Sequence, residues 1–312
     1  MLKRIKDYLL HLLWEPSGAA LCAFFTMLIL CLCNLVNRTL LFSTNAWMLL
    51  ILPLSFVPPF IIFKASRGGA KYIPTEHLSL PQKYHTPTVL YATILLILGS
   101  LLLKILFFEG RYTEFALYGA FFARRDGTLL CDLYLLLAFC IIPPVFEGLV
   151  YRGVFITEHD RRGRFTATLV SALFFAMLGF SFAELPQRLF AGVLLCIVLY
   201  ATRSIAATVA MHVIYNLFAV FVEPTLISVK NVSSNVTLFT FLVAIGSVFS
   251  AFCLFSHLSR LYGKYSRDKN YNNFKKTTPR ERVIWHLAEL LLSAPAIACY
   301  VLFIVVAIII KV

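Results

Sequence analysis

Charged side chains are scarce in this chain. Asp, Glu, Lys and Arg make up 14% of the 312 residues, with 15 acidic residues in all, whereas hydrophobic residues reach 60%. The mean hydropathy is +0.83. Ordinary soluble domains carry about 25% charged residues. The composition therefore excludes a soluble globular protein and predicts an integral membrane protein.

Cysteine pairs with the spacing of a metal site are also missing. All eight cysteines fall within apolar runs, where cysteine behaves as a small hydrophobic residue. A disulfide framework is typical of small secreted domains and not of a long apolar chain. We therefore expect neither a disulfide scaffold nor a cysteine-based metal centre.

Long apolar runs organise the rest of the sequence. Runs of about 20 residues match the thickness of a bilayer core. They predict nine transmembrane helices, at residues 18–36, 46–63, 88–108, 129–151, 166–184, 187–202, 204–222, 237–257 and 284–310. We therefore predict an all-α, polytopic membrane bundle. Because no broken-helix repeat pair is evident, a transporter is a distant alternative.

We divide the bundle into three parts. Residues 1–128 hold three spans behind an interfacial amphipathic helix at residues 1–16. Residues 129–222 form the core. Residues 223–312 hold two spans and a basic cytoplasmic loop.

The net charge of +13 raises the question of a nucleic-acid partner. Its placement argues against one, because Lys and Arg gather in the loops at 64–83, 161–164 and 260–282. With nine spans and a cytoplasmic N-terminus, all three loops lie in the cytoplasm, as the positive-inside rule requires. The segment at 109–128, with three arginines, departs from this rule and is a candidate lid or interfacial segment. We expect membrane lipids as partners, no nucleic acid, and a location in the cell membrane.

Glu147, His212 and Asn216 are polar residues inside the predicted spans. Glu147 is an ionisable group at membrane depth, which costs about 2.5 kcal/mol or more and indicates a use. His212 and Asn216 are four residues apart, so they share one face of a helix. Counted from the inner ends of their spans, Glu147 and His212 lie at similar depth, and a shared cavity open to the cytoplasm is geometrically allowed. The structural alternative is interhelical hydrogen bonding, at about 0.6 kcal/mol per contact.

Three segments around these residues resemble a known family. They are Glu147-Gly-Leu-Val-Tyr-Arg152, Phe175-Ala-Met-Leu-Gly179 and His212-Val-Ile-Tyr-Asn216. In this order they are similar to the motifs Glu-Glu-x-x-x-Arg, Phe-x-x-x-His and His-x-x-x-Asn/Asp of the CPBP (Abi) family. That family comprises CAAX prenyl endopeptidases and bacteriocin-processing enzymes. The resemblance covers about residues 135–222 and implies a helical core with a glutamic-type intramembrane endopeptidase site.

The resemblance also implies a role for each retained residue. Glu147 would activate the attacking water, and His212 with Asn216 would stabilise the oxyanion. Two positions depart from the pattern: Gly148 replaces the second glutamate, and Gly179 replaces the histidine of the second motif. Losing a general acid–base partner costs a factor of about 10²–10⁴ in rate. Glycine cannot bind a metal through a side chain, so we expect no cofactor and no tight metal site.

Two functions remain open at this point. One is an endopeptidase that cleaves peptides near the cytoplasmic leaflet. The other is a pseudoprotease that uses the same cavity to bind or regulate a partner protein, as a scaffold or maturation factor. The retained Glu147, His212 and Asn216 favour the first function, and the two glycines favour the second.

Two further charged residues flank the motifs. Glu184 lies five residues after Gly179, which on a continuous helix moves it about 7.5 Å along the axis and onto another face. We therefore expect Glu184 to mark the end of its span and not to replace the missing histidine. Arg152 diverges from Glu147 on the helix, so we expect it to reach the inner headgroups as an anchor.

Overall fold

The computed structural model describes residues 18–39, 46–66, 80–108, 128–226, 236–267 and 280–311. All regular elements in these ranges are helical, and the all-α prediction is confirmed. In chain order the helices are α2 (Gly18–Thr39), α3 (Ala46–Ser66), η2 (Lys83–His85), α4 (Thr86–Phe108), α6 (Leu129–Leu135), η3 (Leu136–Ile141), α7 (Ile142–Glu147), η4 (Gly148–Phe155), α8 (Ile156–His159), η5 (Asp160–Arg162), α9 (Arg164–Met177), α10 (Leu185–Thr202), α11 (Ile205–Leu217), η6 (Phe218–Val222), α13 (Val236–Arg267), α14 (Arg280–Leu291) and α15 (Ala294–Lys311).

The predicted spans all contain helix, but they differ in length. Five helices are long and apolar enough to cross a membrane: Lys83–Phe107, Leu129–His159, Leu185–Thr202, Ile205–Leu226 and Val236–Arg267. Three shorter apolar helices are Gly18–Cys33, Leu49–Phe63 and Arg164–Met177. The ninth predicted span, at 284–310, consists of two helices, α14 and α15, with a bend of 60° between them. Pro295 at the start of α15 has no backbone N–H, so the helical hydrogen bonding is interrupted there.

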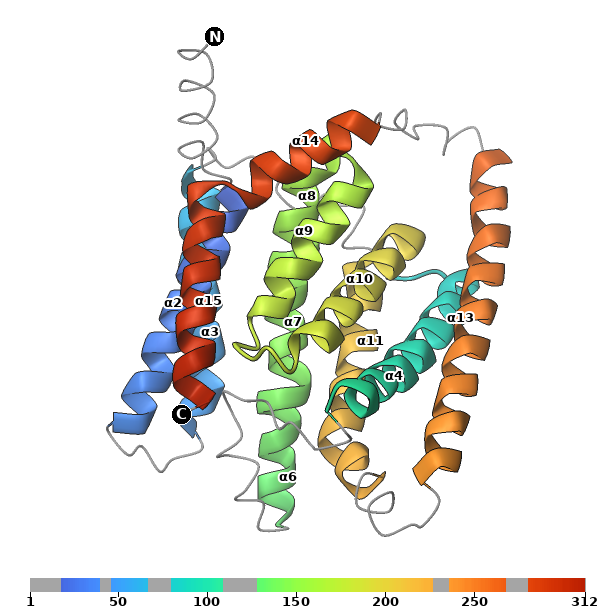
Figure 1. The fold of residues 1–312 in the computed structure, drawn as a ribbon, viewed down its shortest axis with the longest axis horizontal. Helices are drawn as coiled ribbons and strands as arrows, with labels where there is room; N and C mark the ends of the chain where they lie inside the picture. The colour runs from blue at the N-terminus through green and yellow to red at the C-terminus, as the bar shows by residue number, and fades with distance from the viewer. Residues whose placement is uncertain are drawn as a thin grey trace.

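The helices surround a central rod formed by α6, η3, α7, η4 and α8 (Figure 1). On one side of the rod α2 packs against α3 and α15. On the other side α4 packs against α10, α11 and α13, and α13 forms the outer edge. Helix α14 lies across one end of the bundle and contacts α9. The main hydrophobic core is continuous from α2, α3 and α15, through the rod, α9, α10 and α11, to α4 and α13.

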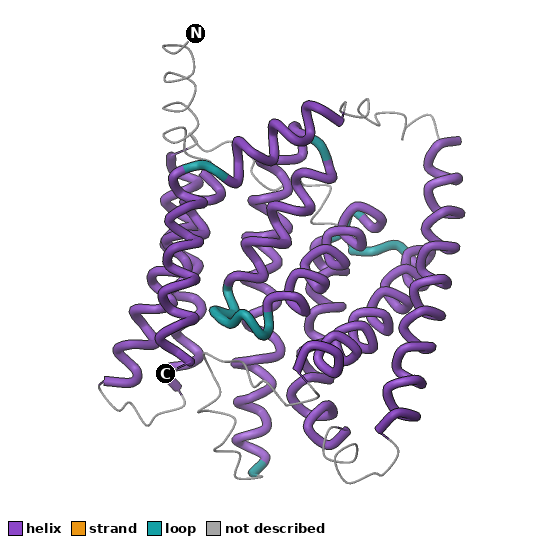
Figure 2. The backbone as a smooth tube through the Cα atoms, viewed as in Figure 1, coloured by secondary structure: helices purple, strands orange, loops and turns teal. Residues whose placement is uncertain are grey.

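The chain reverses direction inside the bundle between α9 and α10. Helix α9 ends at Met177, and the following loop lies well within the height of the bundle (Figure 2). The predicted span at 166–184 is thus too long at its C-terminal end. Phe180 has a φ of 46°, in the left-handed region that few non-glycine residues adopt. Its fully buried ring stacks on Phe303 of α15 at 6.5 Å, which holds the turn in place.

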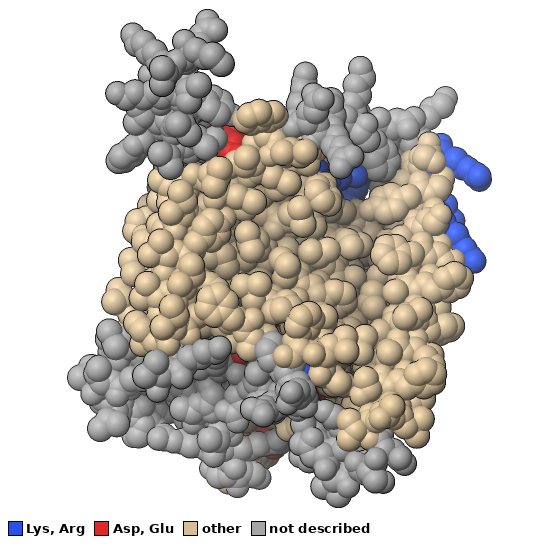
Figure 3. Space-filling model, in the orientation of Figure 1, with Lys and Arg blue, Asp and Glu red and all other residues tan. Residues whose placement is uncertain are grey.

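The outer surface fits a lipid environment. Across the middle of the face in Figure 3, the described surface is almost free of Lys, Arg, Asp and Glu, and basic side chains gather at the end of α13. Phe249, Phe252 and Phe255 on α13 are 60–70% exposed. Such a continuous apolar face is unfavourable in water and favourable against lipid tails. These features identify an integral membrane protein.

Some predictions concern residues outside the ranges that the structure describes. The interfacial helix at 1–16 and nearly all of the segment at 109–128 lie outside the described residues. So do residues 268–279 of the basic loop, while Arg260 and Lys264 belong to the last turns of α13 and not to a loop. The eight cysteines are all described and all free.

Close packing of α9 against α10 depends on a glycine. A Cβ at Gly192 would lie 2.8 Å from the backbone Cα of Ala172, which cannot move aside as a side chain can. We expect Gly192→Ala to destabilise the protein by about 1–3 kcal/mol, as overpacking does. Thermal unfolding in detergent measures this as a lower Tm. Gly263→Ala is the control, because a Cβ there meets nothing within 4 Å; equal Tm values for the two variants would contradict the close approach.

Candidate active site

The central rod carries Glu147 at a change of helix type. Glu147 is the last residue of α7, and the π-helical η4 follows it. π-Helical segments within α-helices are frequent at functional sites. Pro143 and Pro144 precede Glu147 and have no N–H, so neither can donate to the carbonyl of Phe139 one turn earlier. The two prolines thus interrupt the regular helical hydrogen bonding of the Phe139 carbonyl just before Glu147.

Asn216 supplies a hydrogen bond to this interrupted turn. Its Nδ2 donates to the Phe139 carbonyl at 2.9 Å, across 77 residues of sequence. Asn216 is buried, with 4% exposure. One of its two amide hydrogens is therefore committed to the backbone of η3.

His212 faces Glu147 one turn earlier on α11. The His212 Nε2 atom lies 3.8 Å from Glu147 Oε2, and both side chains are less than 10% exposed. The His212 ring also packs edge-on against Phe175 of α9. The structure thus brings Glu147, His212 and Asn216 together from two helices.

Gly148 permits this close approach of α11. A Cβ at position 148 would lie 2.8 Å from Cγ2 of Val209, one turn before His212. Small residues allow helices in membranes to pack with their backbones close together. Gly148, where the family pattern has its second glutamate, therefore allows α11, the helix that carries His212, to pack closely against η4.

This packing makes a testable prediction about Gly148. We expect Gly148→Glu, which restores the family residue, to destabilise the protein by about 1–3 kcal/mol through overpacking. Thermal unfolding in detergent measures the effect. Adding Val209→Ala should recover part of the lost Tm, and a Gly148→Glu protein as stable as the parent would contradict the close contact.

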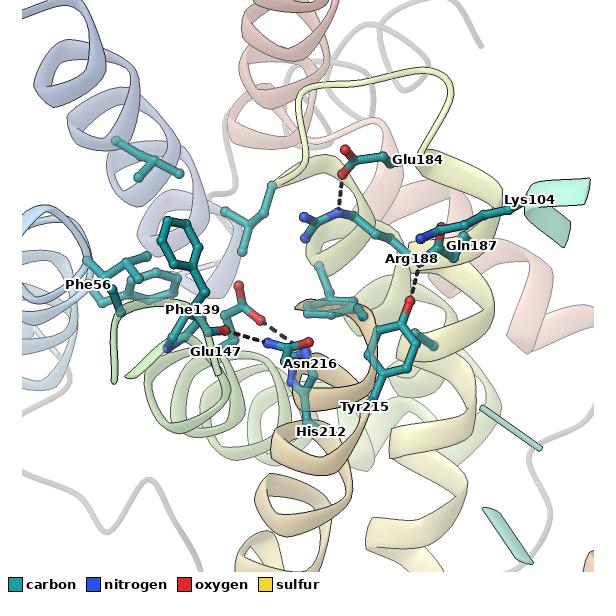
Figure 4. Close-up of a pocket in the computed structure, with 18 residues that line it drawn as sticks. Phe56, Lys104, Phe139, Glu147, Glu184, Gln187, Arg188, His212, Tyr215 and Asn216 are labelled. Atoms are coloured by element: carbon teal, nitrogen blue, oxygen red, sulfur yellow. Dashed lines mark hydrogen bonds and ion pairs between the residues drawn. The ribbon is translucent and has the colours of Figure 1, made fainter. Parts of the chain in front are cut away.

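A cavity of about 60 Å³ lies over these residues (Figure 4). That volume admits a few water molecules. Its lining is both polar and apolar. The polar lining residues are Glu147, Glu184, Gln187, Arg188, His212, Tyr215, Asn216 and Lys104, and the apolar ones include Leu30, Leu52, Phe56, Phe139, Pro143 and Phe175.

Glu184 lies in this cavity, contrary to the sequence-based expectation. The expectation assumed that α9 continues past Gly179, whereas the chain turns at Phe180 and returns. The Glu184 carboxylate accepts a hydrogen bond from Arg188 Nε at 2.9 Å, and the two side chains are 6% and 14% exposed. Sequence reasoning missed Arg188, although its i,i+4 spacing from Glu184 is typical of helical ion pairs.

Arg152 is also placed differently from its prediction. It is 1% exposed, lies over the Phe175 ring at 4.1 Å, and donates to the Glu147 carbonyl at 3.4 Å. The prediction that Arg152 reaches the headgroups as an anchor is therefore wrong. A π-helical turn has i→i+5 hydrogen bonds and so holds more residues than an α-helical turn. Arg152 therefore lies about one turn after Glu147, on the same side of the helix, and faces inward onto α9.

Two further polar pairs border the cavity on the side of α4. Gln187 donates to the Tyr215 hydroxyl, and Lys104 Nζ lies 2.5 Å from Glu223. Lys104 and Glu223 are both nearly buried. Each of these charges thus has an opposite partner within the bundle, as buried charges require.

Two other described histidines, His85 and His257, do not line the cavity. His85 hydrogen-bonds to Tyr265 at 2.7 Å and His257 to Thr88 at 3.0 Å, both at the α4–α13 contact. Among the described residues no three His, Cys, Asp or Glu side chains are grouped closely enough to hold a metal ion. The ionisable groups among the lining residues are the carboxylates of Glu147 and Glu184, the His212 imidazole, the Arg188 guanidinium, the Lys104 ammonium and the Tyr215 phenol.

Comparison with known proteins identified a similar family for the central part of the chain. A family model described as type II CAAX prenyl endopeptidase Rce1-like matches residues 129–218. Comparisons with curated proteins and with solved structures gave no match. The matched segment holds the polar lining residues from Glu147 to Asn216, whereas α2, α3 and α4 outside it complete the cavity. Residues 129–218 of this helical membrane protein are thus similar to the type II CAAX prenyl endopeptidases of the Rce1-like family.

Proposed function

We propose that this protein hydrolyses peptide bonds within the membrane, with Glu147 as the catalytic base. The observation that carries the proposal is the buried Glu147 carboxylate beside His212, at 3.8 Å, in a cavity large enough for water. A carboxylate held in such a place can accept a proton from water. The family assignment of this segment supports the same chemistry.

The reaction needs only water and the peptide. Glu147 accepts a proton from water while the water oxygen bonds to the carbonyl carbon, and the carbonyl electron pair moves to oxygen. The C–N bond then breaks, and protonated Glu147 gives its proton to the leaving nitrogen. His212 and the second amide hydrogen of Asn216 are donors for the developing oxyanion.

The substrate we propose is a membrane-tethered peptide. Leu30, Leu52 and Phe56 are apolar lining residues of the cavity, and they suit an apolar portion of the substrate. The basic loops favour an orientation in which the cavity faces the cytoplasmic leaflet of the cell membrane. Membrane lipids and a peptide or protein in the bilayer are therefore the proposed partners.

A second candidate is a pseudoprotease that binds a partner without cleaving it. The observation that favours it is the absence of the family's second glutamate and second-motif histidine, at Gly148 and Gly179. Such a protein would act as a scaffold, maturation factor or regulator. Its contacts would depend on the shape of the cavity and not on the proton chemistry of Glu147.

One experiment separates the two candidates. Purified protein in nanodiscs is incubated with a library of internally quenched peptides that carry an acyl anchor, and Glu147→Gln is compared with the parent. Cleavage that is lost in Glu147→Gln supports hydrolysis. No cleavage by the parent, together with a copurifying partner that Glu147→Gln retains, supports the pseudoprotease.

A further inference from the structure

We infer that Arg188 is the electrophilic residue of this site, and that its guanidinium binds the carbonyl oxygen of the scissile peptide bond. Glu184 orients Arg188, and Gly179 leaves the space that it occupies. This inference rests on the proposed hydrolysis and assigns a further group, besides His212 and Asn216, that stabilises its oxyanion. Neither Arg188 nor Glu184 belongs to the three motifs of the family resemblance.

The first step of the argument is the space at Gly179. A Cβ at this position would lie 2.6 Å from Arg188 Nε, 2.8 Å from Arg188 Cδ and 3.0 Å from a Glu184 carboxylate oxygen. Real Cβ atoms do not approach other atoms so closely. The side chain of Arg188 thus fills the volume where a histidine side chain at position 179 would begin.

The second step is the orientation of the guanidinium. Glu184 accepts from Arg188 Nε at 2.9 Å, which leaves the far end of the guanidinium directed away from Glu184. Figure 4 shows this end projecting into the cavity that also contains the Glu147 carboxylate. Both Glu184 and Glu147 attract the Arg188 charge. A carbonyl oxygen between Glu147 and Arg188 would meet a base on one side and a cation on the other.

The third step is the supply of hydrogen-bond donors for an oxyanion. Asn216 already uses one amide hydrogen on the Phe139 carbonyl, and His212 faces the Glu147 carboxylate. Arg188 carries several N–H donors and a permanent charge. In a cavity shielded from water, a fixed cation aimed at the developing negative charge is an effective catalyst. The oxyanion formed by water addition would therefore lie against Arg188 until the C–N bond breaks.

The test uses the cleavage assay in nanodiscs with three variants of Arg188 and Glu184. We expect Arg188→Met, which keeps the length of the chain but removes the donors, to lower kcat about 10²–10³-fold with little change in KM. Arg188→Lys should retain part of the activity, and added ethylguanidinium should partly restore Arg188→Met. Glu184→Gln should lower kcat less than Arg188→Met does, because the glutamine side-chain oxygen still accepts from Nε.

Three outcomes would contradict the inferred role of Arg188. Parent-like kcat in Arg188→Met, with Glu147→Gln inactive, overturns the role of Arg188 and leaves the proposed function intact. A loss in Arg188→Met that comes with a much lower Tm and no response to ethylguanidinium assigns Arg188 a structural role and also overturns the inference. If the parent protein does not cleave the peptides, the proposed function is wrong. The inference that Arg188 binds the scissile carbonyl is then wrong as well.

Discussion

Glu147→Gln is expected to lower kcat for peptide cleavage by about 10²–10⁴-fold, the usual contribution of a general base. The change replaces one oxygen by an NH₂ group of similar size, so the packing beside His212 is retained. It also removes a buried ionisable group, whose burial is costly unless it is compensated. We therefore expect the Tm of Glu147→Gln to equal or exceed that of the parent.

This combination of lost activity and retained stability is expected of a residue that takes part in the reaction and not of one that only supports the packing. Glu289→Gln is the matched control, because Glu289 pairs with Arg162 and His286 at the half-exposed end of α14, away from the cavity. It should cleave at the parent rate. A Glu147→Gln protein that cleaves like the parent would exclude Glu147 as the base, whatever its Tm.

Gly179→His is expected to lower activity about 10²-fold or more, although it restores the residue that the family pattern has at this position. The new Cβ would lie 2.6 Å from Arg188 Nε, so the arginine must leave its place beside Glu184. The displaced guanidinium can no longer meet the oxyanion, and removing one such donor costs about 10²–10³-fold in kcat. The cleavage assay with the Gly179→His protein measures this loss.

The double variant tests the cause of this loss. In Gly179→His with Arg188→Ala the histidine has room, so cleavage should exceed that of Gly179→His alone. Contacting residues show such non-additive effects, whereas independent residues do not. Gly179→Ala gives a smaller probe of the same contact. Higher activity in Gly179→His than in the parent would show that the histidine at this position is missing without a replacement. It would also contradict the role of Arg188 in its place.

Much of the fold was predictable because membrane helices leave a strong one-dimensional signal. A helix of about 20 apolar residues is needed to span the bilayer core. Its internal hydrogen bonds satisfy every backbone N–H and C=O group within the bilayer. The nine apolar segments therefore correspond to helices, and the motif spacing located Glu147, His212 and Asn216 on two of them. The helical pair His212 and Asn216 follows from a four-residue period that any helix obeys.

The errors arose where a local irregularity changed the geometry. A continuous helix through Gly179 places Glu184 off the site, but the left-handed Phe180, packed on Phe303, returns Glu184 to it. The π-helical turn after Glu147 likewise turned Arg152 inward, where a regular α-helix directs it to the headgroups. Neither irregularity has a signal in hydropathy.

The sequence by itself thus determined the membrane class, the helical segments and three polar residues on two of these segments. Only the tertiary structure decided what fills the place of the missing histidine, because Arg188 reaches Gly179 through a chain reversal and not along one helix. It also decided that α2 and α3, far from the motifs in sequence, supply apolar lining residues of the cavity. Periodicity describes one helix at a time, whereas a site is made where several helices meet.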